Sequence, residues 1–248
     1  MRYFIGNWKM FGVPRLINIV KSINNFVKKD KNNNKYKAII TPPFTLLESF
    51  SKYAKNKKIS IGAQNCYHKE IFSSDTGAVS PYMVKSTGSK WIIIGHSDNR
   101  SEGDTDEILK NKIHFSLKNN LKVIFCIGEN KNHKKNNQTF TILSKQLTKG
   151  LDKKFNKNNL IVAYEPIWSI GTGKIPNKKD LTKTIKFIKK TLTKIFKSKK
   201  SPAVLYGGSV EGKNVALFKD INEIDGFLVG GASKSSKKFI DIIKNYYR

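Results

Sequence analysis

Short apolar segments alternate with longer segments of helical period along the whole chain. After the first apolar segment, Leu16, Val20, Ile23 and Val27 share one helical face. Further helical faces occur within 181–195 and 239–246. The apolar segments are short and almost free of polar residues, which is typical of strands buried on both faces of a parallel sheet. These predicted strands lie at 2–5, 38–40, 59–63, 91–94, 123–126, 160–164, 203–206 and 226–229.

The alternation predicts an α/β protein that forms a closed (β/α)8 barrel, with one domain spanning residues 1–248. The alternative is an open doubly wound sheet. That fold usually carries a Gly-x-Gly-x-x-Gly turn after its first strand, whereas this chain has Gly6-Asn7-Trp8-Lys9 there. In a closed barrel the active residues project from the carboxyl ends of the strands. The residues that follow each apolar segment are therefore the candidates for chemistry.

Glu165 lies where the sixth predicted strand leaves the core. Pro166 fixes the backbone just after it, and Gly171 and Gly173 supply conformational freedom further on. Such a segment can close as a rigid lid that excludes water from the carboxylate and strengthens the charge interactions beneath it. The alternative is an ordinary loop with a solvated glutamate, and this segment alone does not decide between the two.

Two glycine pairs follow the seventh and eighth predicted strands, at Gly207-Gly208-Ser209 and Gly230-Gly231-Ala232-Ser233. Glycines let backbone N–H groups approach an anion closely, and we expect the helix after each pair to point its positive end at the same place. A single pair is equally consistent with a tight turn. Two pairs at the last two strand ends favour a site for a phosphate monoester.

Polar residues also follow the first and fourth predicted strands. Lys9, close to Asn7, would reach into the mouth of the barrel, where an ammonium offsets phosphate charge and polarises a carbonyl. His96 precedes a helical stretch, and a helix N-terminus favours the neutral imidazole that donates a hydrogen bond. A surface lysine and a structural histidine are the alternatives. With Glu165 as the base, these groups suit proton abstraction next to a carbonyl, with stabilisation of an enediolate.

The composition is strongly basic, with 47 Lys and Arg against 18 Asp and Glu and a net charge of +29. Nucleic-acid binding would need those charges concentrated on one face with aromatic residues for stacking. The lysines instead recur along the whole length, which favours attraction of small anions.

Cys66 and Cys126 form no Cys-x-x-Cys pair, so we expect a reducing compartment. No segment has the pattern of a signal peptide or a membrane span, and a cytoplasmic protein is predicted. The four histidines lack metal-ligand spacing, and we predict neither a metal nor a cofactor.

Taken together, these motifs resemble the triosephosphate isomerase family over essentially the full length of the chain. The resemblance implies a TIM barrel in which Glu165 moves a proton between C1 and C2 of dihydroxyacetone phosphate and glyceraldehyde 3-phosphate, and His96 is the electrophile. It also implies that Lys9 and Asn7 hold the substrate, and that backbone amides of Gly171, Ser209, Gly230 and Gly231 hold the phosphate. The motifs are Asn7-Trp8-Lys9-Met10, Ile94-Gly95-His96-Ser97, 163–173, 206–209 and 226–233. Another sugar-phosphate enzyme on the same scaffold and an RNA-binding protein are the remaining alternatives.

The chain departs from the family pattern at several positions, among them Asp75, where the family usually has Phe. Phe11 replaces the usual Asn, with an effect expected to be local, and Asp98 replaces Glu, so its hydrogen bond near Lys9 is expected to be longer or bridged by water. Ala78 and Asn99 replace the two partners of a charge pair, and a matched loss leaves neither charge unpaired. The resemblance still implies a homodimer docked through residues 65–79, with Thr76 contacting the second subunit near Asn7.

Overall fold

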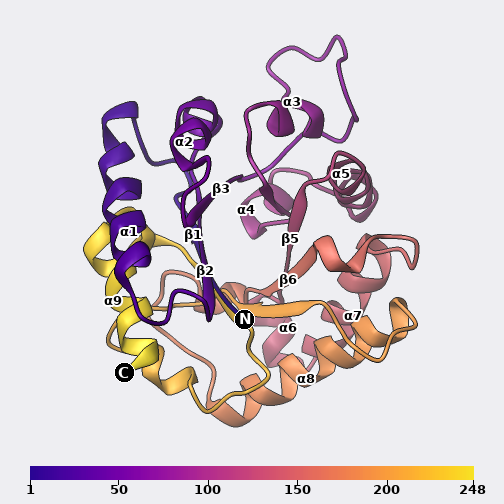
Figure 1. Cartoon of the computed structure of the whole chain (residues 1–248). Helices are drawn as coiled ribbons and strands as arrows, with labels where there is room; N and C mark the ends of the chain where they lie inside the picture. The colour runs from indigo at the N-terminus through magenta and orange to yellow at the C-terminus, as the bar shows by residue number, and fades with distance from the viewer.

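The computed structural model describes residues 1–248 and contains a closed barrel of eight parallel strands surrounded by helices (Figure 1). Each strand pairs with the next along the chain, and pairing between β1 and β8 closes the barrel. The fold confirms the predicted (β/α)8 barrel. The predicted strands coincide with β3, β4, β6, β7 and β8, whereas β1, β2 and β5 are longer than predicted. The strands are β1 (Arg2–Asn7), β2 (Tyr36–Thr41), β3 (Ile59–Ala63), β4 (Trp91–Ile94), β5 (Lys122–Ile127), β6 (Leu160–Tyr164), β7 (Ala203–Tyr206) and β8 (Gly226–Val229).

Helices connect successive strands and bury the apolar faces predicted from their period. Val20, Ile23 and Val27 are buried on α1, whereas Leu16 ends the preceding 3₁₀ helix η1 (Pro14–Leu16) and is half-buried. The faces predicted within 181–195 and 239–246 lie on α8 and α9. Polar side chains begin several helices, as when Asn177 accepts a hydrogen bond from the backbone of Asp180. The α-helices are α1 (Ile17–Lys29), α2 (Leu47–Ala54), α3 (Pro81–Ser86), α4 (Ser97–Ser101), α5 (Asp106–Lys118), α6 (Lys131–Lys135), α7 (Thr139–Gly150), α8 (Lys178–Ile195) and α9 (Ser236–Tyr247).

The core has two layers, because successive strand residues point alternately outward and inward. Phe4 packs in the large cluster between strands and helices, whereas its neighbour Ile5 packs inside the barrel. The interior cluster also contains Ile39, Ile93, Ile124 and others, all nearly inaccessible to solvent. The barrel is therefore packed along its axis, and a cavity for chemistry is restricted to its ends.

The connections after β7 and β8 place their next helical segments at different distances from the glycine pairs. After β8, the short 3₁₀ helix η6 (Gly231–Lys234) does begin at the glycine pair. After β7 the next helical segment is the 3₁₀ helix η5 (Val215–Phe218), which begins several residues beyond the glycine pair. The intervening loop is closed by Asn214, whose side chain accepts from the Glu211 amide at 2.9 Å and donates to the Ser209 carbonyl at 3.1 Å. These side-chain bonds add to a backbone turn in which the Glu211 carbonyl accepts from the amides of Asn214 and Val215 at 3.1 and 3.0 Å.

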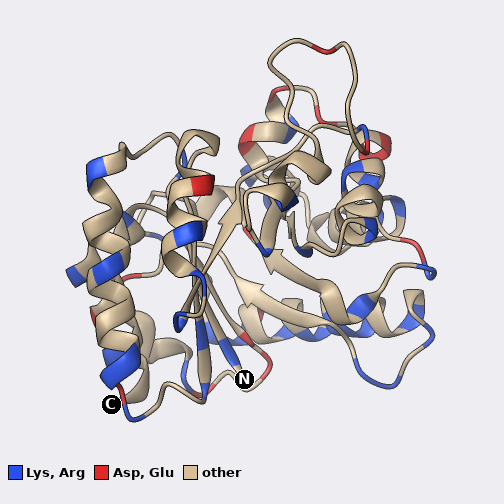
Figure 2. Ribbon diagram, turned by 45° about the horizontal axis from the view of Figure 1, so that its top comes forward, with Lys and Arg blue, Asp and Glu red and all other residues tan.

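Lysines and arginines are spread over several helices and also occur at strand starts near the N-terminus (Figure 2). None of the helices combines the length and the apolar character that crossing a bilayer would need.

Candidate active site

The carboxyl ends of five strands converge on a cavity of about 320 Å³. All the residues that the sequence analysis placed in the site line it. They come from the ends of β1, β4, β6, β7 and β8 and from the loop after β6: Asn7, Lys9, His96, Glu165, Gly171, Ser209, Gly230 and Gly231. The structure thus brings together groups that are more than 200 residues apart along the chain.

Glu165 presents a buried carboxylate to this cavity. Its backbone amide donates to the Ile127 carbonyl at 2.8 Å, which holds it at the end of β6. The residue is 5% exposed, and its Oε2 has no hydrogen-bond partner. A Cβ atom at position 207 would lie 2.6 Å from Glu165 Cγ, so Gly207 leaves the room that this side chain occupies. A buried carboxylate oxygen without a donor is free to accept a proton.

His96 is oriented by the helix that it begins. Its Nδ1 accepts a hydrogen bond from the Asp98 amide at 3.1 Å, so Nδ1 carries no proton and the neutral ring is protonated at Nε2. Nε2 lies 3.6 Å from Glu165 Oε1. That distance is beyond ordinary hydrogen-bonding range, so the N–H remains available to a substrate oxygen.

Lys9 adopts a left-handed backbone conformation, with φ of 54°, which is unusual for a residue other than glycine. The Lys9 amide donates to Asn7 Oδ1 at 3.0 Å, and the Lys9 carbonyl accepts from Gln64 Nε2 at 2.9 Å. The Lys9 ammonium lies 3.2 Å from Asp98 Oδ2. The shorter Asp98 therefore contacts Lys9 directly, at the long end of the usual range, in agreement with the longer of the two expected arrangements.

The lid after β6 lies against the loop after β7. Gly171 and Gly173 have φ values of 68° and 73°, a region that glycine adopts without strain. The Gly173 amide donates to Ser209 Oγ at 3.1 Å, and that hydroxyl donates to the Ser169 carbonyl at 2.7 Å. The amides of Gly171, Ser209 and Gly230 donate to no other group of the chain. Three free backbone donors around one end of the cavity suit a bound anion.

Two further residues support the site and were not singled out from the sequence. Gln64 follows β3 and Glu129 follows β5 closely, so the rule of inspecting every strand end would have found both. Glu129 is 1% exposed and accepts from Trp168 Nε1 at 2.8 Å and from the Tyr164 hydroxyl at 3.2 Å. Burial, with the nearby Glu129 charge, raises the pKa of Tyr164 and keeps it a donor. The start of the lid is thereby anchored to the loop after β5.

We expect Gln64→Ala to lower kcat/KM about tenfold, because losing its partly buried hydrogen bonds to the Lys9 and Thr41 carbonyls releases the strained Lys9 backbone. Steady-state kinetics would measure the effect. The matched control is Asn245→Ala, which removes a side-chain bond to the Gly212 carbonyl away from Lys9. Equal losses in the two variants would show that the effect is a general one on stability.

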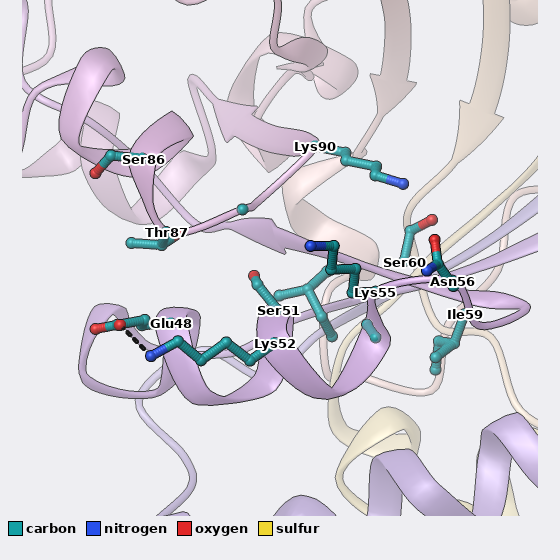
Figure 3. Close-up of a pocket in the computed structure, with 13 residues that line it drawn as sticks. Glu48, Ser51, Lys52, Lys55, Asn56, Ile59, Ser60, Ser86, Thr87 and Lys90 are labelled. Carbon is teal, nitrogen blue, oxygen red and sulfur yellow. Dashed lines mark ion pairs between the residues drawn. The ribbon is translucent and has the colours of Figure 1, made fainter.

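A larger hollow of about 460 Å³ lies outside the barrel, between α2, β3 and the end of α3 (Figure 3). Its one carboxylate, Glu48, is paired with Lys52 at 2.6 Å, and no histidine lines it. This hollow therefore lacks a free acid–base pair. No group of three or more potential metal ligands comes together anywhere in the structure.

The chain forms a closed (β/α)8 barrel with a cavity at the carboxyl ends of its strands. A buried carboxylate, an imidazole and a lysine line this cavity, which is the architecture of a barrel enzyme. The family model described as triosephosphate isomerase matches residues 2–246. The chain belongs to the triosephosphate isomerase family and is an isomerase.

Individual relatives agree with this assignment. The chain is 37% identical over 245 residues to the triosephosphate isomerase of Thermodesulfovibrio yellowstonii, with 98% of each chain covered. It is 38% identical over 247 residues to that of Finegoldia magna, covering 97% of this chain and 96% of the relative. The crystal structure of triosephosphate isomerase from Bartonella henselae superposes with a TM-score of 0.90 at 28% identity, covering 100% of this chain and 99% of the other.

Proposed function

We propose that the protein interconverts dihydroxyacetone phosphate and D-glyceraldehyde 3-phosphate by proton transfer through an enediolate. The observation that carries the proposal is the unpartnered, buried Glu165 oxygen beside the His96 Nε2–H, in a cavity that also offers free backbone amides. Family membership supports the substrate pair. The geometry supports the assignment of chemical roles.

In the proposed reaction, Glu165 takes a proton from C1 of dihydroxyacetone phosphate, and the electron pair moves to the carbonyl oxygen at C2. His96 Nε2–H donates to that oxygen, and the Lys9 ammonium offsets the negative charge that develops there. A proton then moves from the hydroxyl at C1 to the oxygen at C2. Glu165 returns the proton that it took from C1 to C2, and the aldehyde is complete. No atom is gained or lost, and no cofactor takes part.

The phosphate is proposed to be held by the amides of Gly171, Ser209, Gly230 and Gly231, with Asn7 and Lys9 beside the carbon chain. Gly171 belongs to the lid, so phosphate binding and lid closure stabilise one another. Closure also removes water from the enediolate. An enediolate that stayed exposed to water would be able to eliminate its phosphate group.

The direct test is an assay of glyceraldehyde 3-phosphate, in which a dehydrogenase coupled to its formation reports the product from dihydroxyacetone phosphate. We expect rapid turnover without added metal or cofactor. Activity on another sugar phosphate with none on the triose phosphates would support the alternative enzyme on this scaffold. Binding of RNA with sequence preference, and no isomerase activity, would support the nucleic-acid alternative.

We also propose that the protein forms a homodimer through residues 65–79. In that loop Ile71 is 52% exposed and Phe72 is 72% exposed, and Phe72 packs edge-on against Tyr82 at a ring separation of 5.4 Å. Exposed apolar side chains on an ordered loop mark a surface that association would bury. A single domain over residues 1–248 and a cytoplasmic location stay predictions from the sequence.

We expect Phe72→Asp to weaken dimerisation by roughly thirtyfold or more, because a central aromatic contact of an interface typically contributes about 2 kcal/mol or more. Sedimentation velocity at micromolar concentration would measure it. Leu217→Asp is the control, since Leu217 is 60% exposed but lies on η5, outside the proposed interface. A wild-type protein that sediments only as a monomer would contradict the homodimer.

A further inference from the structure

The end of the barrel opposite the active site carries a ring of positive charge. Every strand except β8 begins at, or within three residues after, a lysine or an arginine, and β8 follows Asp225. In Figure 2, blue segments mark strand starts close to the N-terminus. Parallel strands place all their starts at one end of the barrel, so residues scattered through the sequence become neighbours there.

Part of this ring surrounds a cavity of about 400 Å³ at the starts of β5, β6 and β7. Four lysines line it: Lys122, Lys157, Lys189 and Lys200. The first three are only partly accessible to solvent. We call this cavity with its four lysines the basic bowl. Its volume is within the size range of cavities that bind small molecules.

The charges in the basic bowl are poorly compensated. Asp225 is its one carboxylate, and it already pairs with Lys189 at 2.8 Å, lies 4.0 Å from Arg2 and accepts from the Val204 amide at 2.8 Å. Lys122 and Lys157 form no ion pair with any carboxylate. A bound anion would supply the missing negative charge.

Lys122 shows this imbalance most clearly. Its ammonium lies over the ring of Trp91, 5.2 Å from the centroid, and makes no ion pair. Burial lowers the pKa of Lys122, and repulsion from Lys37, Lys90 and Lys85 lowers it further. Lys157 is held in place by donating to the Ser198 hydroxyl and, at 3.4 Å, to the Lys200 carbonyl. Two ammonium groups thus line one cavity, and neither is paired with a carboxylate.

We propose that the basic bowl binds a compact phosphate-bearing polyanion, such as inorganic polyphosphate or the phosphate chain of a nucleotide. Several convergent ammonium groups match an anion that carries several charges over a short length. An extended nucleic acid fits less well, because it needs exposed aromatic faces for stacking. Trp91 is 4% exposed, and Tyr3 packs edge-on against it at a ring separation of 6.0 Å.

The test is isothermal titration calorimetry with inorganic tripolyphosphate, and with ATP in a second arm, on the full-length enzyme. We expect Lys122→Met with Lys157→Met to weaken the binding of tripolyphosphate about tenfold or more, since each removes a charged contact. Lys131→Met with Lys179→Met is the control, because it removes the same charge from exposed positions on α6 and α8. The control should stay within about threefold of wild type, and isomerase activity should be unchanged in both double variants.

Each arm of the experiment decides something. Similar affinities for tripolyphosphate and ATP would support recognition of the phosphate chain alone, and tighter binding of ATP would support a nucleotide site. Unchanged tripolyphosphate binding in the Lys122 and Lys157 variant would overturn the proposal, since the anion would then bind elsewhere, as in the phosphate loops of the active site. Binding of a short single-stranded RNA without binding of tripolyphosphate would also overturn it. Because activity is measured separately, failure here is distinguishable from failure of the isomerase assignment.

Discussion

Glu165→Gln is expected to lower kcat by roughly 10²- to 10⁴-fold, the range in which a positioned general base contributes to catalysis. Glutamine has nearly the same shape, so the cavity and the fit against Gly207 are retained. It cannot accept the carbon-bound proton at the buried position of Oε2. KM should change little, because the phosphate is proposed to bind to backbone amides. Steady-state kinetics in both reaction directions would measure the two constants.

Glu165→Asp provides a graded version of the same test. Withdrawing the carboxylate by about one bond length should preserve substrate binding and still lower kcat by about 10²-fold, since a misplacement of that size is costly for proton transfer. Glu211→Gln is the control, because Glu211 also lines the cavity but its carboxylate pairs with Lys213 at 3.0 Å. Unchanged turnover in Glu165→Gln would remove Glu165 from the mechanism.

Lys9→Met is expected to lower kcat/KM by roughly 10³-fold. The Lys9 ammonium is proposed to hold the substrate and to offset the developing enediolate charge, and one such electrostatic group contributes about 10²- to 10³-fold to kcat alone. Methionine keeps most of the apolar stem. A rise in KM should accompany the fall in kcat, in contrast to the Glu165 variants. The measurement is again steady-state kinetics, with the thermal unfolding midpoint recorded in parallel.

Lys131→Met separates this local effect from the loss of one positive charge. Lys131 is exposed on α6 and makes no ion pair, so its replacement changes the net charge equally and should leave kcat/KM within about threefold of wild type. If Lys9→Met lowered activity no more than Lys131→Met does, the ammonium of Lys9 would have no specific role. A large fall in the unfolding midpoint of Lys9→Met would instead attribute the lost activity to lower stability of the fold.

Much of the fold could be predicted because it depends on local pattern. The apolar segment 160–164 coincides with β6, and Glu165 follows it at the carboxyl end of that strand, where parallel topology directs side chains to one rim. The same rule applied to β3 and β5 would have found Gln64 and Glu129. The rule also located Ser209 after β7, but it did not show how that loop is closed, because the closure depends on side-chain hydrogen bonds of Asn214. Such a loop is decided by a few specific hydrogen bonds and leaves no periodic signal in the sequence.

The sequence by itself determined the alternation of strands and helices, the closed barrel that eight such units form, and the set of strand ends at which Lys9, His96 and Glu165 stand. Only the tertiary structure decided that the Asp98 amide directs the His96 proton to Nε2, that Asp98 contacts Lys9 directly, and that lysines from several strand starts surround one cavity. The physical reason is that hydrogen bonding and electrostatic interaction depend on distance in space. Closure of the barrel sets those distances between residues that no local pattern connects.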